Sequence, residues 1–128
     1  MLITNTTPLI IGSIYGALAI IFGAFGAHAL KKHMDKDQLE SFEVGVKYQM
    51  YHAILLLILG LMPNAEIIRH ASNIISIGVL LFSFSIYGLT LSGTFGKKIK
   101  ILGPITPIGG LCMVIGWLML LYYFITLL

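Results

Sequence analysis

The sequence predicts an all-α integral membrane protein: a four-helix bundle with a short amphipathic helix at the membrane surface between helices one and two. Two observations lead to this prediction. Of 128 residues, 58% are hydrophobic and only 10% are charged, whereas soluble globular chains carry about 25% charged residues. Asp, Glu, Lys and Arg are also absent from four runs, residues 1–30, 48–65, 70–96 and 101–128. A helix needs roughly 20 apolar residues to cross a hydrocarbon core.

The uncharged runs set the expected helices. We expect transmembrane helices at about 8–30, 48–63, 70–94 and 104–127, within a single domain of residues 1–128. A soluble bundle is excluded, because a chain this short cannot bury four helices that are apolar on every side. The first run is too long for a cleaved signal peptide and no basic residue precedes it, so we expect it to be retained.

The segment between the first two runs has its own helix signals. Asp35 is a predicted N-cap, and Gln38 completes a capping box with it. Charged and apolar side chains then fall on opposite faces, which predicts an interfacial helix at about 36–47. We expect this helix to bend or to run directly into the second transmembrane helix. Gly45 is either a hinge or a small contact residue.

The basic residues are distributed unevenly along the chain. Only Arg69 lies in the second connection, and the first and third connections hold all the others: Lys31, Lys32, Lys36, Lys47, Lys97, Lys98 and Lys100. An excess of Lys and Arg marks cytoplasmic connections. The sequence therefore predicts a bacterial inner-membrane protein with connections one and three cytoplasmic and both termini outside. Anionic membrane lipid is the expected partner of these lysines, and nucleic acid is not.

A few polar residues lie in or beside the apolar runs and are the candidate ligand-binding residues. They are His28, Lys47, Gln49, His52, Thr90 and Thr106. The predicted topology places all six in the cytoplasmic half of the bundle, with His28 and His52 at similar depth. Ionisable groups inside a membrane are functional candidates by default. Two readings stay open for them: hydrogen bonds between helices, or binding of a ligand, lipid head group or proton.

The remaining patterns allow two readings each. The third run carries a row of hydroxyl groups, which either bond within the bundle or line a hydrated path: Ser76, Ser83, Tyr87, Thr90 and Thr94. Gly12 and Gly16 have the spacing at which helices approach closely, either within the chain or in a homo-oligomer. No Cys, Asp or Glu at ligand spacing accompanies the histidines, so the sequence predicts no metal site or catalytic set and names no cofactor.

Three segments resemble the signatures of a known family. They are Gly23–Lys31, Phe42–Ala53 and Gly103–Gly110, the last followed by Gly116-Trp117. Together they are similar to domain-of-unknown-function family 423, the YwdK-like small membrane proteins. The resemblance implies a four-helix bacterial inner-membrane protein and supplies no activity, ligand or catalytic residue. From Gly109 and Gly110 we also expect helix four to pack against the region of His28, Gln49 and His52.

The leading functional hypothesis is a non-enzymatic scaffold, assembly or lipid-interacting module, as a homo-oligomer or with another membrane protein. Four helices with short connections leave no extramembrane domain for chemistry. The first alternative is a small-solute transporter or channel that uses the hydroxyl row with His28 and His52. The second is a metal- or haem-handling protein that uses the same histidines.

Overall fold

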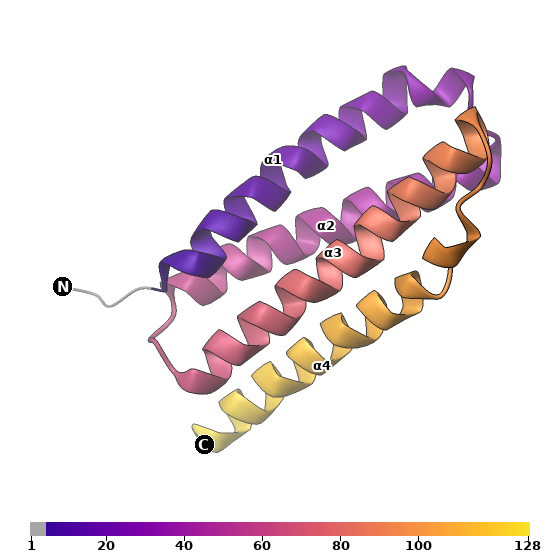
Figure 1. Cartoon of the computed structure of the whole chain (residues 1–128). Helices are drawn as coiled ribbons and strands as arrows, with labels where there is room; N and C mark the ends of the chain where they lie inside the picture. The colour runs from indigo at the N-terminus through magenta and orange to yellow at the C-terminus, as the bar shows by residue number, and fades with distance from the viewer. Residues whose placement is uncertain (1–4) are drawn as a thin grey trace.

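Four long helices make up the computed structural model, which describes residues 5–128. They are α1 (Thr6–His28), α2 (Lys36–Leu61), α3 (Glu66–Phe95) and α4 (Ile105–Thr126), with single 3-10 turns at Leu30–Lys32 and Lys100–Leu102. Each helix is long and apolar enough to cross a membrane. The predicted all-α, four-helix membrane architecture is confirmed (Figure 1).

The segment 36–47 follows one of the two courses predicted for it. It is helical and runs directly into the second transmembrane helix, so one uninterrupted helix spans Lys36 to Leu61 and no separate interfacial helix forms. It begins at the predicted capping box, in which Asp35 accepts from the backbone N–H of Gln38 and the Gln38 side chain accepts from that of Asp35. No proline interrupts α2, and Gly45 is a contact residue packed against Ile86 and Tyr87.

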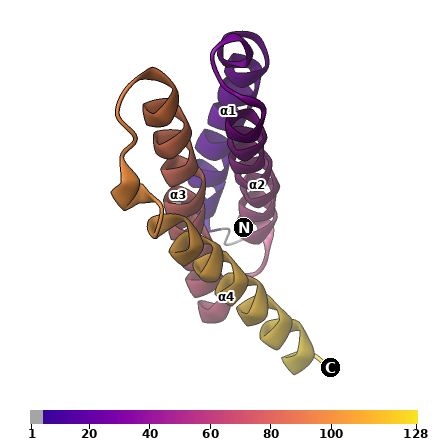
Figure 2. The same cartoon turned by 90° about the vertical axis from the view of Figure 1, so that its right-hand side faces the viewer.

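The helices pair as two hairpins, α1 with α2 and α3 with α4, which are joined by packing of α2 on α3. The α1–α2 and α3–α4 connections, with their lysines at 31, 32, 97, 98 and 100, lie together at one end of the bundle, hereafter the basic end (Figure 1). The C-terminus and the α2–α3 turn lie at the opposite end. Figure 2 shows α4 crossing the other helices obliquely.

Glycine allows close approach within both hairpins. A Cβ at Gly12 would lie 2.8 Å from the carbonyl oxygen of Ala53, so this face of α1 is occupied by α2 of the same chain. A Cβ at Gly109 would meet the backbone of Gly78 and Phe82 on α3. The prediction that this glycine pair packs α4 against the region of His28, Gln49 and His52 is wrong, since both glycines face α3.

Candidate functional site

Gln49 joins three helices through a buried hydrogen-bond network. Its side chain is 0% exposed. The amide nitrogen Nε2 donates to the carbonyl oxygen of Tyr15 on α1 at 2.8 Å. The amide oxygen Oε1 accepts from the hydroxyl of Tyr87 on α3 at 2.7 Å. A second bond between α2 and α3, from Ser83 Oγ to the carbonyl of Gly45, lies one turn away. These bonds, hereafter the Gln49 network, connect α2 to α1 and to α3 inside the bundle.

His52 uses both ring nitrogens within the chain. Nδ1 lies 2.7 Å from the carbonyl oxygen of Tyr48, which can only accept, so Nδ1 carries the proton. The indole N–H of Trp117 on α4 can only donate, and it reaches Nε2 at 3.1 Å. The two partners together define the neutral Nδ1–H tautomer. They also leave no ring lone pair for a metal ion while the Trp117 bond is made.

The structure does not bring His28 to His52. Opposing contacts between α1 and α2 set the register, with Gly26 against Phe42 and Gly16 against Ala53. His52 therefore lies level with Gly16, and His28 lies roughly 18 Å farther toward the basic end at 1.5 Å of rise per residue. The expectation of equal depth fails because α2 starts at Lys36, which places residue 52 well inside the helix.

The other predicted site residues lie in different surroundings. His28 ends α1 and is exposed, and Lys47 is exposed on the outer face of α2. Thr90 Oγ1 donates to the carbonyl of Ile86, and Thr106 lies 2.6 Å from the hydroxyl of Ser85. Only Thr90 and Thr106 of the six predicted residues line a pocket at the basic end.

Every hydroxyl in the α3 row is engaged in a hydrogen bond. Ser76 and Thr90 bond to carbonyls of their own preceding turn. Ser83 and Tyr87 reach α2, as described above, and Thr94 bonds both to its own helix and to Gln38. These contacts match the first of the two readings given by the sequence, bonds within the bundle.

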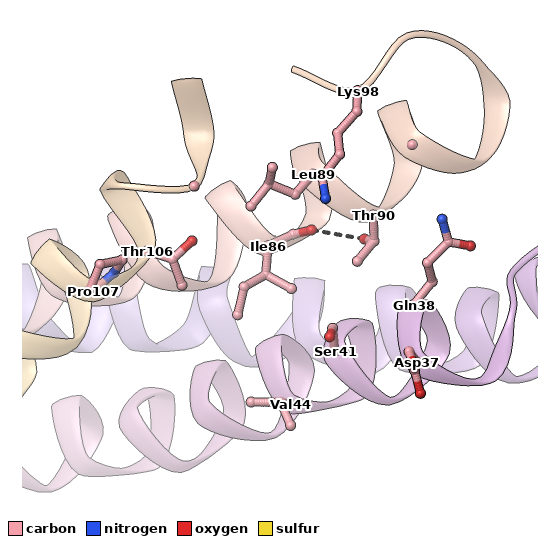
Figure 3. A pocket seen from close by; sticks show the side chains of 12 residues that line it. Asp37, Gln38, Ser41, Val44, Ile86, Leu89, Thr90, Lys98, Thr106 and Pro107 are labelled. Carbon is pink, nitrogen blue, oxygen red and sulfur yellow. Dashed lines mark hydrogen bonds between the residues drawn. The ribbon is translucent and has the colours of Figure 1, made fainter. Parts of the chain in front are cut away.

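A polar groove opens at the basic end between α2, α3 and the start of α4 (Figure 3). Its volume is about 600 Å³. Its lining comprises Asp37, Gln38, Ser41, Val44, Ile86, Leu89, Thr90, Gly93, Lys98, Gly103, Thr106 and Pro107. Sequence reasoning missed the α2 residues because it placed them in a surface helix. It missed Lys98 because the path of the α3–α4 connection has no local sequence signal.

The lining of the polar groove changes in polarity along the bundle axis. Successive turns of α2 contribute Asp37 and Gln38, then Ser41, then Val44. The α3 wall changes in the same direction, from Thr90 toward Ile86. The groove is therefore charged at its outer end and mainly apolar toward the membrane centre, where Val44, Ile86 and Pro107 lie with the hydroxyl of Thr106 (Figure 3).

Four polar groups of the groove have no hydrogen-bond or ion-pair partner among residues 5–128: the Lys98 ammonium, the Asp37 carboxylate, the Gln38 amide nitrogen and the Ser41 hydroxyl. In Figure 3 Lys98 extends over Leu89 toward Thr90, and Gln38 rises from the α2 wall. Asp37 lies at the rim with its carboxylate turned outward. The groove thus presents one cation, one amide donor and one free hydroxyl to a ligand (Figure 3).

A second hollow of about 330 Å³ lies between α2 and α4 toward the opposite end, with Leu55, Ile58, Trp117 and Leu121 among its apolar lining residues. It offers nothing but a hydrophobic surface. Within the described residues, no group of three or more His, Cys, Asp or Glu side chains is placed to hold a metal ion.

Four membrane-crossing helices with short connections and a hydrogen-bonded interior define a small multi-pass membrane protein. Residues 22–110 match the model of a family described as a protein of unknown function, DUF423. The chain belongs to this family.

Curated bacterial relatives are named as membrane proteins. A UPF0382 membrane protein of Staphylococcus aureus is 40% identical over 115 residues, covering 88% of this chain and 90% of the relative. One from Staphylococcus haemolyticus is 39% identical with the same coverage. The UPF0382 membrane protein YwdK of Bacillus subtilis is 35% identical over 116 residues, again covering 88% and 90%. No solved structure matches the chain significantly.

Proposed function

We propose that this protein is a non-enzymatic, lipid-binding membrane protein that holds the phosphate head of a glycerophospholipid in the polar groove. The observation behind the proposal is that the groove is charged at its outer end and mainly apolar at its deeper end, the order in which a phospholipid presents its head and its acyl chains. Basic pockets between transmembrane helices are a recognised type of site for phospholipid heads. Lys98, the Gln38 amide and the Ser41 hydroxyl are the donors available for a phosphate.

The depth of the groove supports the same proposal. A hydrocarbon core about 30 Å thick takes roughly 20 residues of helix. Arg69 is the charged residue of α3 near the opposite end of the bundle. Twenty residues farther along α3, the far boundary of the hydrocarbon core falls near Leu89. Leu89 lines the groove, and Lys98 follows it in the connection. A lipid in the adjoining leaflet would present its phosphate at this level.

Orientation is part of the proposal. The basic end would face the cytoplasm of a bacterial cell and both termini would lie outside, because Lys and Arg accumulate on cytoplasmic connections. The groove would then belong to the cytoplasmic leaflet of the cell membrane. The distribution of lysines in the sequence supports this assignment.

A pair of matched lysine variants tests the proposal. Delipidated protein in mild detergent is titrated with phospholipid, and adducts are counted by native mass spectrometry. We expect Lys98→Gln to weaken binding roughly tenfold, the scale of losing one charge-assisted hydrogen bond. Lys97→Gln removes the same charge one residue away, outside the groove, and should bind as the wild type does. Equal binding by both variants and the wild type would refute the proposal.

A further inference from the structure

The side-chain amide of Gln38 has a fixed orientation. The backbone N–H of Asp35 donates to Oε1 at 3.1 Å, and because this N–H can only donate, the amide oxygen must occupy that position. The hydroxyl of Thr94 on α3 lies 3.2 Å from the same oxygen. The amide nitrogen Nε2 therefore takes the other position of the group, where it has no acceptor among residues 5–128. The capping box of α2 thus holds a free donor in the groove.

Gly93 lies beside this nitrogen, in the last turn of α3. A Cβ at Gly93 would lie 3.5 Å from Gln38 Nε2 and 3.9 Å from both Cγ and Cδ of Lys98. The Gln38 amide and the Lys98 stem therefore approach the same point above Gly93, one from α2 and the other from the α3–α4 connection (Figure 3). The gap between them is part of the polar groove, and it is open because position 93 has no side chain.

Neither the backbone nor the packing requires glycine at position 93. No glycine among residues 5–128 has a positive φ, so alanine can adopt the helical conformation found there. Contacts of 3.5 and 3.9 Å are ordinary van der Waals contacts, whereas a Cβ at Gly109 would overlap the backbone of α3. Alanine also favours a helix more than glycine does. The open gap is therefore not needed for folding, and binding is the role left for it.

We infer that the gap above Gly93 is the phosphate subsite of the polar groove and that Gly93 keeps it open; this inference rests on the proposed function. A lipid phosphate in the gap accepts a hydrogen bond from Gln38 Nε2, and the Lys98 ammonium supplies the opposite charge. Both of these groups can only donate, so the gap accepts an oxyanion and disfavours an amine. The phosphate is therefore the part of the lipid head that the gap recognises.

Alanine at position 93 tests the gap itself. Delipidated protein in mild detergent is titrated with dioleoylphosphatidylglycerol, and native mass spectrometry counts the adducts. We expect Gly93→Ala to weaken binding roughly fivefold, the lower end of the cost of overpacking, because the methyl group takes space from the phosphate. Its melting temperature should not fall. Gly110→Ala adds a methyl group outside the groove, 3.7 Å from Phe82, and should bind as the wild type does.

Gln38→Glu tests the donor while keeping the cap. A carboxylate still accepts the backbone N–H of Asp35, so α2 should begin as before. The substitution replaces Nε2 by a negative oxygen beside the phosphate, and we expect binding to fall roughly tenfold or more. Lys36→Gln changes the net charge by the same amount on the exposed face of α2, outside the groove, and should not lower binding. Dioleoylglycerol, which has the same acyl chains and no phosphate, should bind the wild type and Gln38→Glu alike.

Thermal melting of each variant in the same detergent verifies folding, and Gln38→Glu decides the question should Gly93→Ala fail to fold. Wild-type affinity in Gly93→Ala or in Gln38→Glu, together with weaker binding in Lys98→Gln, would overturn the inference and leave the proposed function standing. An equal loss of dioleoylglycerol in Gln38→Glu would also overturn it, because the effect would not depend on the phosphate. No phospholipid adduct on the wild type would overturn both.

Discussion

The indole nitrogen of Trp117 donates to Nε2 of His52 at 3.1 Å, a bond from α4 to α2 across the bundle. Trp117 is 51% exposed and His52 is 5% exposed, so the bond joins an exposed side chain to a buried one. The imidazole also stacks on Tyr48, with ring centroids 6.2 Å apart. The main packing of α4 is on α3, and this bond gives its C-terminal half a polar attachment to α2.

We expect Trp117→Phe to lower the free energy of unfolding by about 0.5–1.5 kcal/mol, because it removes the N–H and leaves an aromatic ring in place. Unfolding by SDS in mixed micelles measures the change. Tyr122→Phe, which alters an exposed aromatic residue on the same helix, is the control and should have little effect. In a His52→Ala background Trp117→Phe should cost much less, and a full cost there would show that the bond does not contribute.

Removing the Tyr87 hydroxyl should weaken the Gln49 network. Tyr87→Phe leaves Gln49 Oε1 buried without a donor, and we expect a loss of roughly 0.5–2 kcal/mol in the same unfolding measurement. Tyr51→Phe is the matched control, since Tyr51 lies on α2 and is 58% exposed. If the two variants unfold alike, Gln49 obtains no net stabilisation from Tyr87.

Substitution by alanine at two neighbouring glycines of α4 should affect the free energy of unfolding differently. A Cβ at Gly109 would collide with the backbone of α3, so Gly109→Ala should cost about 1–3 kcal/mol by forcing the helices apart. A Cβ at Gly110 would only touch the ring of Phe82, at 3.7 Å. Gly110→Ala should therefore be neutral or stabilising by up to about 1 kcal/mol through helix propensity. Equal losses from both would contradict the α3–α4 packing.

Cysteine labelling tests the proposed orientation. In a Cys112→Ser background, single cysteines replace Lys97 at the basic end or Asn64 in the α2–α3 turn, both of which are exposed. A membrane-impermeant maleimide applied to intact protoplasts should label the cysteine at position 64 and spare the one at position 97. Lysis should make both reactive. The reverse pattern in intact protoplasts would invert the assignment.

Local sequence signals predicted the helices well. The capping box at Asp35 and Gln38 lies where expected, and α4 begins within one residue of the predicted position 104, because such signals depend on residues a few positions apart. For α2 the local signals left two courses open, a bend near residue 47 or a helix that runs directly into the second span. The fold decides between them, because the charged residues occupy the outer face of a helix whose inner face continues unbroken into the core.

The candidate site was less predictable because its contacts are distant in sequence. Gln49 was identified as unusual, yet its partners Tyr15 and Tyr87 lie 34 and 38 residues away. Nothing near His52 in the sequence indicates Trp117, which lies 65 residues away. The polar groove depends on how the α3–α4 connection brings Lys98 opposite α2, and only the folded chain determines that path.

The bond from Gln49 to Tyr15 ends on a main-chain carbonyl. Any amino acid at position 15 supplies that acceptor, so the bond tolerates substitution there. It does not tolerate insertion or deletion, since one added residue would rotate the carbonyl by roughly 100° about the α1 axis. The bond from Gln49 therefore constrains the register of α1 against α2 but not the type of residue at position 15. Position 15 can change without altering how the first two helices pack.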